Sequence, residues 1–123
     1  AELLSRLKAG NILMALASSS VRSIVQIAVD KLGLDKYLQA IATGDEVKNG
    51  KSDPEIFLLA AAKLGVPPAE CVVFEDAPAG IEAAHRAGMK VVAVPHASSP
   101  AENLQDADLI LGNLAEFKFD LLK

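Results

Sequence analysis

The segment VVFEDAPAGIEAAHRAGMKVVAV, residues 72–94, carries the clearest sign of a fold class in this chain. An apolar run typical of a β-strand ends at two adjacent carboxylates, Glu75 and Asp76, and an alanine-rich helical segment and a second apolar run follow. Like charges side by side at the end of a buried strand repel each other and lose hydration. The stretch therefore predicts a strand–helix–strand unit whose first strand ends at a cation site.

The same alternation of apolar runs and helical patterns continues on both sides of this segment. Strands are expected at residues 12–17, 39–44, 70–76, 90–94 and 108–111, and helices at 1–10, 21–34, 52–65, 79–88 and 114–123. Aliphatic strands that alternate with helices predict an α/β fold, a parallel sheet with helices on both faces. Right-handed crossovers then bring the carboxyl ends of the strands to one edge, where such sheets bind ligands.

Length and composition indicate one domain with an aliphatic core. The chain has 123 residues, of which 51% are hydrophobic, and its net charge is −4, with 12 basic against 16 acidic residues. The absence of a basic tract excludes a dedicated nucleic-acid binder. Apolar runs are too short to span a membrane, and a single cysteine, Cys71, rules out an internal disulfide. We expect a cytoplasmic protein, and the sequence gives no indication of its oligomeric state.

Three serines follow the first expected strand and lead into a helix. Hydroxyl groups together with the free N–H groups of a helix start suit an anion such as phosphate. Ser18, Ser19 and Ser20 are therefore candidates for a phosphate site. Alternatively, one of the serines simply caps the next helix, a role for which serine is favoured.

Lys51 stands directly before a helix that opens with a capping-box pattern, Ser52 with Glu55. A lysine there opposes the positive end of the helix dipole, which is unfavourable for an isolated cation. A bound phosphate or a carboxylate cluster would remove the objection. The alternative is a solvated loop lysine.

Glu75 and Asp76 are candidate Mg²⁺ ligands, because Mg²⁺ is usually held by one or two carboxylates, phosphate oxygens and water. Alternatively, Asp76 caps the following helix and Glu75 points to solvent.

Taken together, these segments resemble the haloacid dehalogenase superfamily, most closely its β-phosphoglucomutase and phosphoglycolate-phosphatase-like branch. MALASSS at residues 14–20 is similar to the second motif of that family, KSDPEIF at 51–57 to its lysine motif, and residues 72–94 to its acidic motif. The resemblance implies a Rossmann-like core and Mg²⁺-dependent phosphoryl transfer on a small phosphorylated metabolite through an aspartyl-phosphate. The enzyme would be a phosphatase or a phosphomutase.

The resemblance also implies roles for individual residues. Ser18 would bond a transferring phosphoryl oxygen, with the backbone N–H of Ser19 as a second donor. Lys51 would bridge the nucleophile and the phosphoryl group, and Asp76 would bind Mg²⁺ while Glu75 binds the ion or its water.

The first motif of that family, an apolar strand that ends in Asp-x-Asp, has no counterpart here. The sole Asp-x-Asp, residues 106–108, precedes the last expected strand and is interpreted as a turn. In the family the missing strand is central, between those represented by residues 12–17 and 72–75, and a cap domain also belongs upstream. Residues 1–123 are thus expected to be a partial core domain that is inactive by itself.

Two alternatives remain. One is a non-catalytic fragment or binding module that keeps the phosphate and Mg²⁺ groups. The other is a receiver-type signalling domain, which the chain order disfavours because Lys51 precedes the acidic pair. The histidines, His85 and His96, are expected on the surface and in a loop, and Asp45 and Glu46 are expected to be solvated loop residues.

Overall fold

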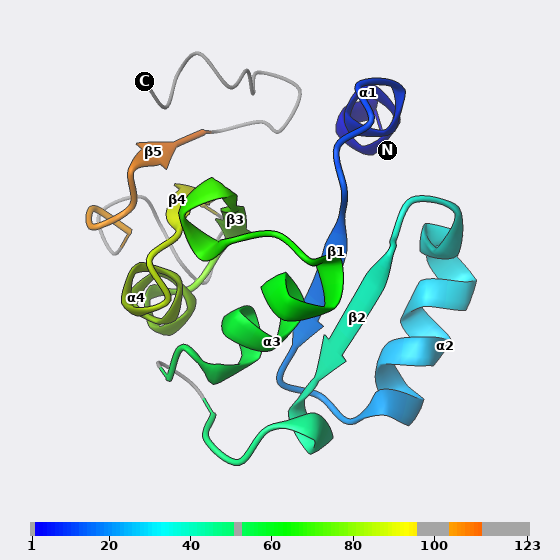
Figure 1. The fold of residues 1–123 in the computed structure, drawn as a ribbon, viewed down its shortest axis with the longest axis horizontal. Coiled ribbons are helices and arrows are strands. Elements are labelled where there is room, and N and C mark those ends of the chain that lie inside the picture. Colours follow the sequence, from blue (N-terminus) through cyan, green and yellow to red (C-terminus); the bar gives the residue numbers. More distant parts are fainter. Residues whose placement is uncertain (1, 51–52, 96–103, 112–123) are drawn as a thin grey trace. The chain divides into compact units, whose positions relative to one another are not determined.

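A computed structural model describes residues 2–50, 53–95 and 104–111 of the chain. They form two compact units. Figure 1 shows the helices and strands of both. Unit 1 contains the described residues up to Gly50 together with Glu55–Pro67, and unit 2 contains the other described residues.

Unit 1 is built on two parallel strands. Its elements are α1 (Glu2–Ala9), β1 (Ala15–Ser18), α2 (Arg22–Leu32), η1 (Leu34–Lys36), β2 (Ala40–Thr43), η2 (Gly44–Glu46) and α3 (Glu55–Leu64). β1 and β2 pair in parallel, with Ala15 opposite Ala40 and Ser18 opposite Thr43. The helix α3 packs across both strands and buries Ala60 and Ala61, whose small side chains allow a close approach.

The expected strand at 12–17 is shorter at its start than the apolar run suggested. Ile12 and Leu13 are 40% and 49% exposed, and β1 begins at Ala15. Met14 instead connects to the residue before β2: its N–H donates to Gln39 Oε1 over 2.6 Å, and its carbonyl accepts from Gln39 N over 2.8 Å. The run is apolar, but only its second half enters the ladder.

The helix α2 confirms the helix expected at 21–34. At its C-terminus the Gly33 N–H donates to the carbonyls of Asp30 and Val29, and the Gly33 φ of 64° is the left-handed conformation that glycine adopts without a steric penalty. Val25 and Val29 are buried. Three other apolar residues of α2 are more than half exposed: Ile24, Ile27 and Leu32.

Unit 2 contains the strand–helix–strand segment of residues 72–94. Its elements are η3 (Pro68–Glu70), β3 (Val72–Glu75), α4 (Pro78–Arg86), β4 (Lys90–Ala93) and β5 (Leu109–Ile110). The strands form a parallel ladder in the order β3-β4-β5. Val91, Val92 and Ala93 in the middle strand are fully buried, so both faces of β4 are covered, as expected for a parallel sheet. α4 begins with Pro78 in its first turn and buries Ile81.

The α/β fold with parallel strands is confirmed. The described strands form two ladders, and none of them pairs with both β1 and β3, the position at which the resemblance expects a further strand. The predicted helix at 114–123 and most of the turn-rich segment 95–107 lie outside the described residues. Within the part of the chain that the structure describes, no helix has the length and apolar character needed to cross a membrane.

Candidate active site

The loops that follow β1 and β2 lie side by side, because the two strands are parallel and Ser18 pairs with Thr43. The loop after β1 turns at once: Ser20 N donates to Ser18 Oγ over 3.2 Å. The loop after β2 is joined to it by Gly44 N, which donates to the Ser20 carbonyl over 2.8 Å. The strand ends therefore bring the candidate phosphate residues Ser18 and Ser19 against the 43–46 turn.

Gly44 touches the backbone of Ser19. A Cβ atom on Gly44 would lie 2.0 Å from the Ser19 carbonyl oxygen and 2.7 Å from its carbon. Real Cβ atoms do not approach backbone atoms so closely, so a residue with a side chain at 44 would have to move the Ser19 peptide. Glycine at this position is a requirement of the loop-to-loop contact.

The interpretation of a serine as the cap of the following helix is wrong. The residue at the cap of α2 is Val21, with extended φ and ψ of −72° and 157°, and it makes no side-chain cap hydrogen bond. The first N–H group of the helix, that of Arg22, donates instead to Asp45 Oδ1 over 3.2 Å. A carboxylate at the start of a helix is favourable both as an acceptor and against the dipole.

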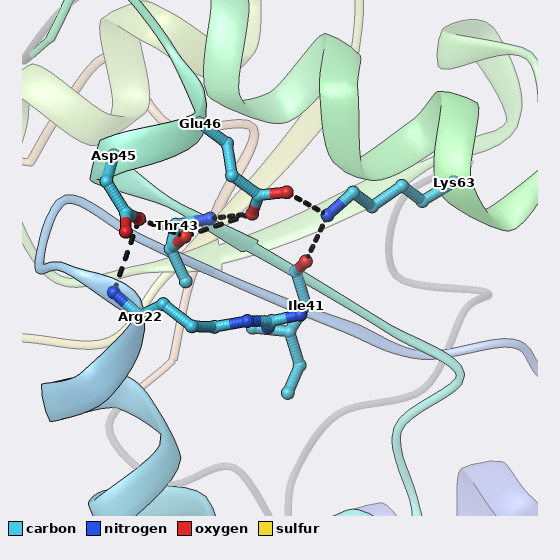
Figure 2. Close-up of polar contacts among 6 residues, drawn as sticks. All are labelled: Arg22, Ile41, Thr43, Asp45, Glu46 and Lys63. Carbon is cyan, nitrogen blue, oxygen red and sulfur yellow. Dashed lines mark hydrogen bonds and ion pairs between the residues drawn. The ribbon is translucent and has the colours of Figure 1, made fainter.

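Asp45 and Glu46 are exposed, as expected for solvated residues, but they also belong to a hydrogen-bonded network that the sequence did not predict, shown in Figure 2. Thr43 and Glu46 form a capping box, with Thr43 N donating to Glu46 Oε2 over 2.8 Å. Lys63 of α3 pairs with Glu46 Oε1 and also donates to the Ile41 carbonyl over 2.6 Å. The Thr-x-x-Glu spacing of residues 43–46 is the sequence signal from which this box could have been predicted, although it was not.

Both carboxylates of this network are held in the ionised form. Hydrogen bonds from Lys63 and then from Thr43 lower the pKa of Glu46 to about 2. The Thr43 hydroxyl, and after it the Arg22 N–H, lower the pKa of Asp45 against the opposing effect of burial. Each of these donors stabilises the charged form.

Glu75 and Asp76 lie at the end of β3, as predicted. Asp76 N donates to Glu75 Oε1 over 3.0 Å. Burial raises the pKa of the Glu75 carboxyl, the Asp76 side chain raises it further, and N–H donors from Asp76 and Ala77 oppose the rise. The Glu75 side chain occupies the space above Gly80 in the first turn of α4, where a Cβ atom would lie 2.1 Å from Glu75 Cδ. The alternative interpretation, in which Glu75 points to solvent, is therefore wrong: its side chain lies against the first turn of α4.

This donor set fits a hard divalent cation in part. Two neighbouring carboxylates offer oxygen ligands, and a cation beside them would relieve the unfavourable charge on the partly buried Glu75. Among the described residues, no group of three or more His, Cys, Asp or Glu side chains gathers as a complete metal cage. The number of carboxylates is thus that of an Mg²⁺ site that takes its other ligands from phosphate and water.

The Asp-x-Asp segment lies at the other end of the strands, as predicted. It forms a turn ahead of β5, and Asp108 Oδ2 accepts from Val91 N, near the start of β4, over 2.8 Å and lies 3.0 Å from His85 Nε2. Glu75 and Asp76 lie where β3 ends. Asp108 is therefore a structural residue of unit 2.

Of the predicted site residues, Ser18 and Ser19 belong to unit 1, and Glu75 and Asp76 belong to unit 2. Lys51 and His96 lie outside the described residues. The segment just before Lys51 is anchored by Glu55, whose Oε1 accepts from Lys48 N over 3.0 Å and from Asn49 N over 2.9 Å. The first residue of α3 thus binds the backbone at Lys48 and Asn49, ahead of the lysine motif.

Comparison with known proteins identifies the class. A family model described as haloacid dehalogenase-like hydrolase matches residues 1–88. The chain belongs to this family.

Named relatives fall within the branch expected from the motifs. The chain is 39% identical over 110 residues to the phosphorylated carbohydrates phosphatase of Thermotoga maritima, covering 89% of this chain and 51% of the relative. It is 38% identical over 118 residues to the validoxylamine A 7'-phosphate phosphatase of Streptomyces hygroscopicus subsp. limoneus, covering 96% and 55%. The chain spans about half the length of the curated relatives it matches.

Solved structures agree. The β-phosphoglucomutase from Clostridium difficile matches with a TM-score of 0.85 and 37% identity, over 97% of this chain and 51% of that one. CbbY from Rhodobacter sphaeroides, solved in complex with xylulose-(1,5)bisphosphate, matches with a TM-score of 0.85 and 30% identity, over 94% and 52%. The predicted family and its β-phosphoglucomutase-like branch are confirmed.

Proposed function

We propose that residues 1–123 are part of the core domain of a cytoplasmic enzyme that transfers the phosphoryl group of a small phosphorylated metabolite with the help of Mg²⁺, as a phosphatase or a phosphomutase. The observation that carries the proposal is the pair Glu75 and Asp76, a partly buried carboxyl with a raised pKa next to a second carboxyl at a strand end. A divalent cation shared by the two would remove the cost of holding them together. The names of the relatives, a carbohydrate-phosphate phosphatase among them, support the substrate class.

Asp76 would hold Mg²⁺ directly, and Glu75 would hold the ion or one of its waters. When bound, Mg²⁺ supplies positive charge that offsets the negative charge of the phosphoryl oxygens. The protein supplies donors as well. Because the Ser18 hydroxyl accepts the Ser20 N–H, its own proton can be donated to a phosphoryl oxygen. The Ser19 N–H is the second donor of the proposal.

Lys51 would complete the charge balance by bridging the phosphoryl group and the nucleophile. The Glu55 carboxylate supports this role, because it fixes the backbone at Lys48 and Asn49, directly ahead of the lysine motif.

An aspartyl-phosphate intermediate requires an aspartate at the end of a strand beside these groups. The Asp-x-Asp at 106–108 is a turn, with Asp108 bonded at the start of β4. We therefore expect the nucleophile to come from outside residues 1–123, and we expect this chain alone to be inactive.

The test compares the 123-residue chain with the complete polypeptide, using p-nitrophenyl phosphate and MgCl₂. Turnover is expected only in the complete polypeptide, and Asp76→Asn should abolish it while Asp106→Asn, in the turn, should leave it unchanged. Turnover by the 123-residue chain that is lost in Asp76→Ala would refute the missing-nucleophile argument. A complete polypeptide that binds phosphate and Mg²⁺ without turnover would establish a binding module instead.

A further inference from the structure

One continuous hydrogen-bonded path crosses unit 1, and none of the residues proposed for catalysis belongs to it (Figure 2). It runs from the first N–H of α2, at Arg22, to Asp45, then through Thr43 to Glu46. From Glu46 it continues to Lys63 of α3 and returns to β2 at the Ile41 carbonyl. Two helices and a strand are thereby tied to the short turn of residues 43–46.

The 43–46 turn contacts both the start of α2 and the loop after β1. Asp45 Oδ1 lies 3.2 Å from Arg22 N and 2.5 Å from Thr43 Oγ1, and the Thr43 side chain is fully buried. On the other side, Gly44 N donates to the Ser20 carbonyl over 2.8 Å, and Gly44 leaves no room for a Cβ atom beside Ser19. The Ser18–Ser20 loop is thus held from behind by the 43–46 turn.

We propose that Asp45 and Glu46 are positioning residues that fix the Ser18–Ser20 loop in its phosphate-binding shape, with Lys63 as their anchor on α3. The proposal rests on the proposed function in one respect, that this loop binds phosphate. Asp45 acts through Arg22 and Thr43, and Glu46 acts through Thr43.

Charge alone gives no reason for these two carboxylates to be here. Anions beside a phosphate-binding loop repel the ligand, so a purely electrostatic optimum would place neutral or basic side chains at 45 and 46. Their geometry does give a reason. Each carboxylate accepts more than one hydrogen bond from groups that must stay together, and Lys63 offsets the charge of Glu46.

The two explanations predict different results for two substitutions of one residue. Asn keeps an oxygen that can accept from Arg22 N and Thr43 Oγ1 but removes the charge, whereas Ala removes both. A positioning role predicts that Asp45→Asn retains the loop and Asp45→Ala loses it. A role that depends on the charge predicts that both variants behave alike.

The first measurement needs no ligand. Hydrogen exchange of the complete polypeptide, followed by mass spectrometry over peptides that contain Ser18–Ser23 and Ile41–Glu46, reports opening of the two loops. Asp45→Ala should speed exchange in both peptides by about five- to tenfold, the effect of one or two lost hydrogen bonds, while Asp45→Asn stays within about twofold of the unmodified chain. Asp30→Ala is the matched control, because it removes an exposed carboxylate of α2 that accepts from Gln26 of the same helix, and it should leave both peptides unchanged.

The second measurement adds inorganic phosphate. Phosphate should slow exchange in the Ser18–Ser23 peptide of the unmodified chain and of Asp45→Asn, and the concentration for half effect should rise about tenfold in Asp45→Ala. Gly44→Ala should raise the phosphate concentration for half effect in the same way, because its Cβ atom displaces the Ser19 peptide.

The outcomes separate the two ideas. Unchanged exchange in Asp45→Ala, or equal effects of Ala and Asn, would overturn the positioning role. If phosphate leaves the unmodified chain unaffected while Asp45→Ala opens the loops and Asp45→Asn does not, the phosphate site of the proposed function fails and the positioning of the loop stands. If Asp45→Ala unfolds unit 1, Asp45→Asn and Gly44→Ala still decide the matter.

Discussion

The carboxyl group of Glu75 lies directly over Gly80, so a Cβ atom at position 80 would be 2.2 Å from Glu75 Oε2. We expect Gly80→Ala to displace this carboxyl, because the end of a flexible side chain yields more easily than the backbone of a helix. Alanine is favoured over glycine inside a helix by about 0.5–1 kcal/mol, so α4 itself should not be weakened. The rise in melting temperature that Mg²⁺ produces should therefore shrink in Gly80→Ala without a matching loss of stability in the metal-free chain.

Gly10→Ala is the control for this substitution. A Cβ atom at Gly10 would meet its nearest neighbours at 3.6 Å, an ordinary contact. An equal loss of the Mg²⁺ effect in both variants would show that the space above Gly80 has no role in the metal site.

Asp76→Asn tests the metal ligand itself. A neutral amide oxygen is a weaker ligand for Mg²⁺ than a carboxylate, and we expect the Mg²⁺ affinity to fall at least about tenfold. The stabilisation of a folded protein by a ligand grows with the logarithm of ligand concentration over dissociation constant, so a series of melts against MgCl₂ gives the affinity. Asp106→Asn, in the turn before β5, should leave that series unchanged, and a similar loss in both variants would place the ion elsewhere.

Asp108 should matter for stability through two bonds. Its Oδ2 accepts from Val91 N and lies 3.0 Å from His85 Nε2. Asp108→Ala leaves the partly buried Val91 N–H without this acceptor, which costs about 1–3 kcal/mol of unfolding free energy in urea melts. Asp108→Asn, which retains an acceptor, should cost less; if Ala and Asn cost the same, the Val91 bond is not the reason.

The pH dependence of the same variant has a definite sign. Burial raises the pKa of Asp108, but the Val91 N–H, His85 and Lys90 together lower it below its ordinary value. A lowered pKa contributes stability above the ordinary pKa and loses it as the pH falls through the folded-state pKa. Asp108→Ala should therefore cost most near neutral pH and progressively less in acid.

Glu46 provides a second test of acid stability, in unit 1. Its pKa is lowered to about 2 from an ordinary value near 4.5. The Lys63–Glu46 pair therefore stabilises the fold above about pH 4.5, and this contribution is lost as the pH falls towards about 2. In Glu46→Gln the loss of unfolding free energy between about pH 4.5 and about pH 2 should be smaller than in the unmodified chain. Urea melts at several pH values would measure this difference.

Glu82→Gln is the matched control, because it removes an exposed ion pair to Arg86 one helical turn away. It should leave the acid transition close to that of the unmodified chain. An acid transition that Glu46→Gln does not alter would show that the Lys63 pair contributes nothing measurable.

The two ladders predict how the 123-residue chain behaves by itself. Among the described strands, β1 pairs with β2 alone and β3 with β4 alone, so each has an edge without a described strand. Unpaired edges are templates for pairing with other chains. We expect light scattering after gel filtration to find self-association, or calorimetry to find a broad transition; a sharp, cooperative transition of a monomer would contradict this expectation.

Local features of the sequence were sufficient for most of the helices and strands. The period of the apolar residues and Gly33 predicted α2, and the break from apolar to acidic residues predicted the end of β3. The start of β1 was not predictable in the same way, because Ile12 and Leu13 continue an apolar run and only tertiary contacts decide that they stay exposed.

The candidate site was predictable in its residue types and less so in its connections. The carboxylate pair and the serines follow from motif and strand end, whereas the cap of α2 comes from Asp45, 23 residues away, and the partner of Glu46 is 17 residues away in α3. Such contacts depend on the register of β1 and β2, which no local pattern states. A serine cap was the reasonable local expectation, and a distant carboxylate replaced it.

The contact between Gly44 and Ser19 has a consequence for how this family diversifies. A gene that acquires a side chain at position 44 must also acquire a different backbone path at position 19, so neither change is tolerated alone. Sequences descended from a common ancestor should therefore vary at these two positions jointly, and such covariation would be a historical record of the packing between the two loops.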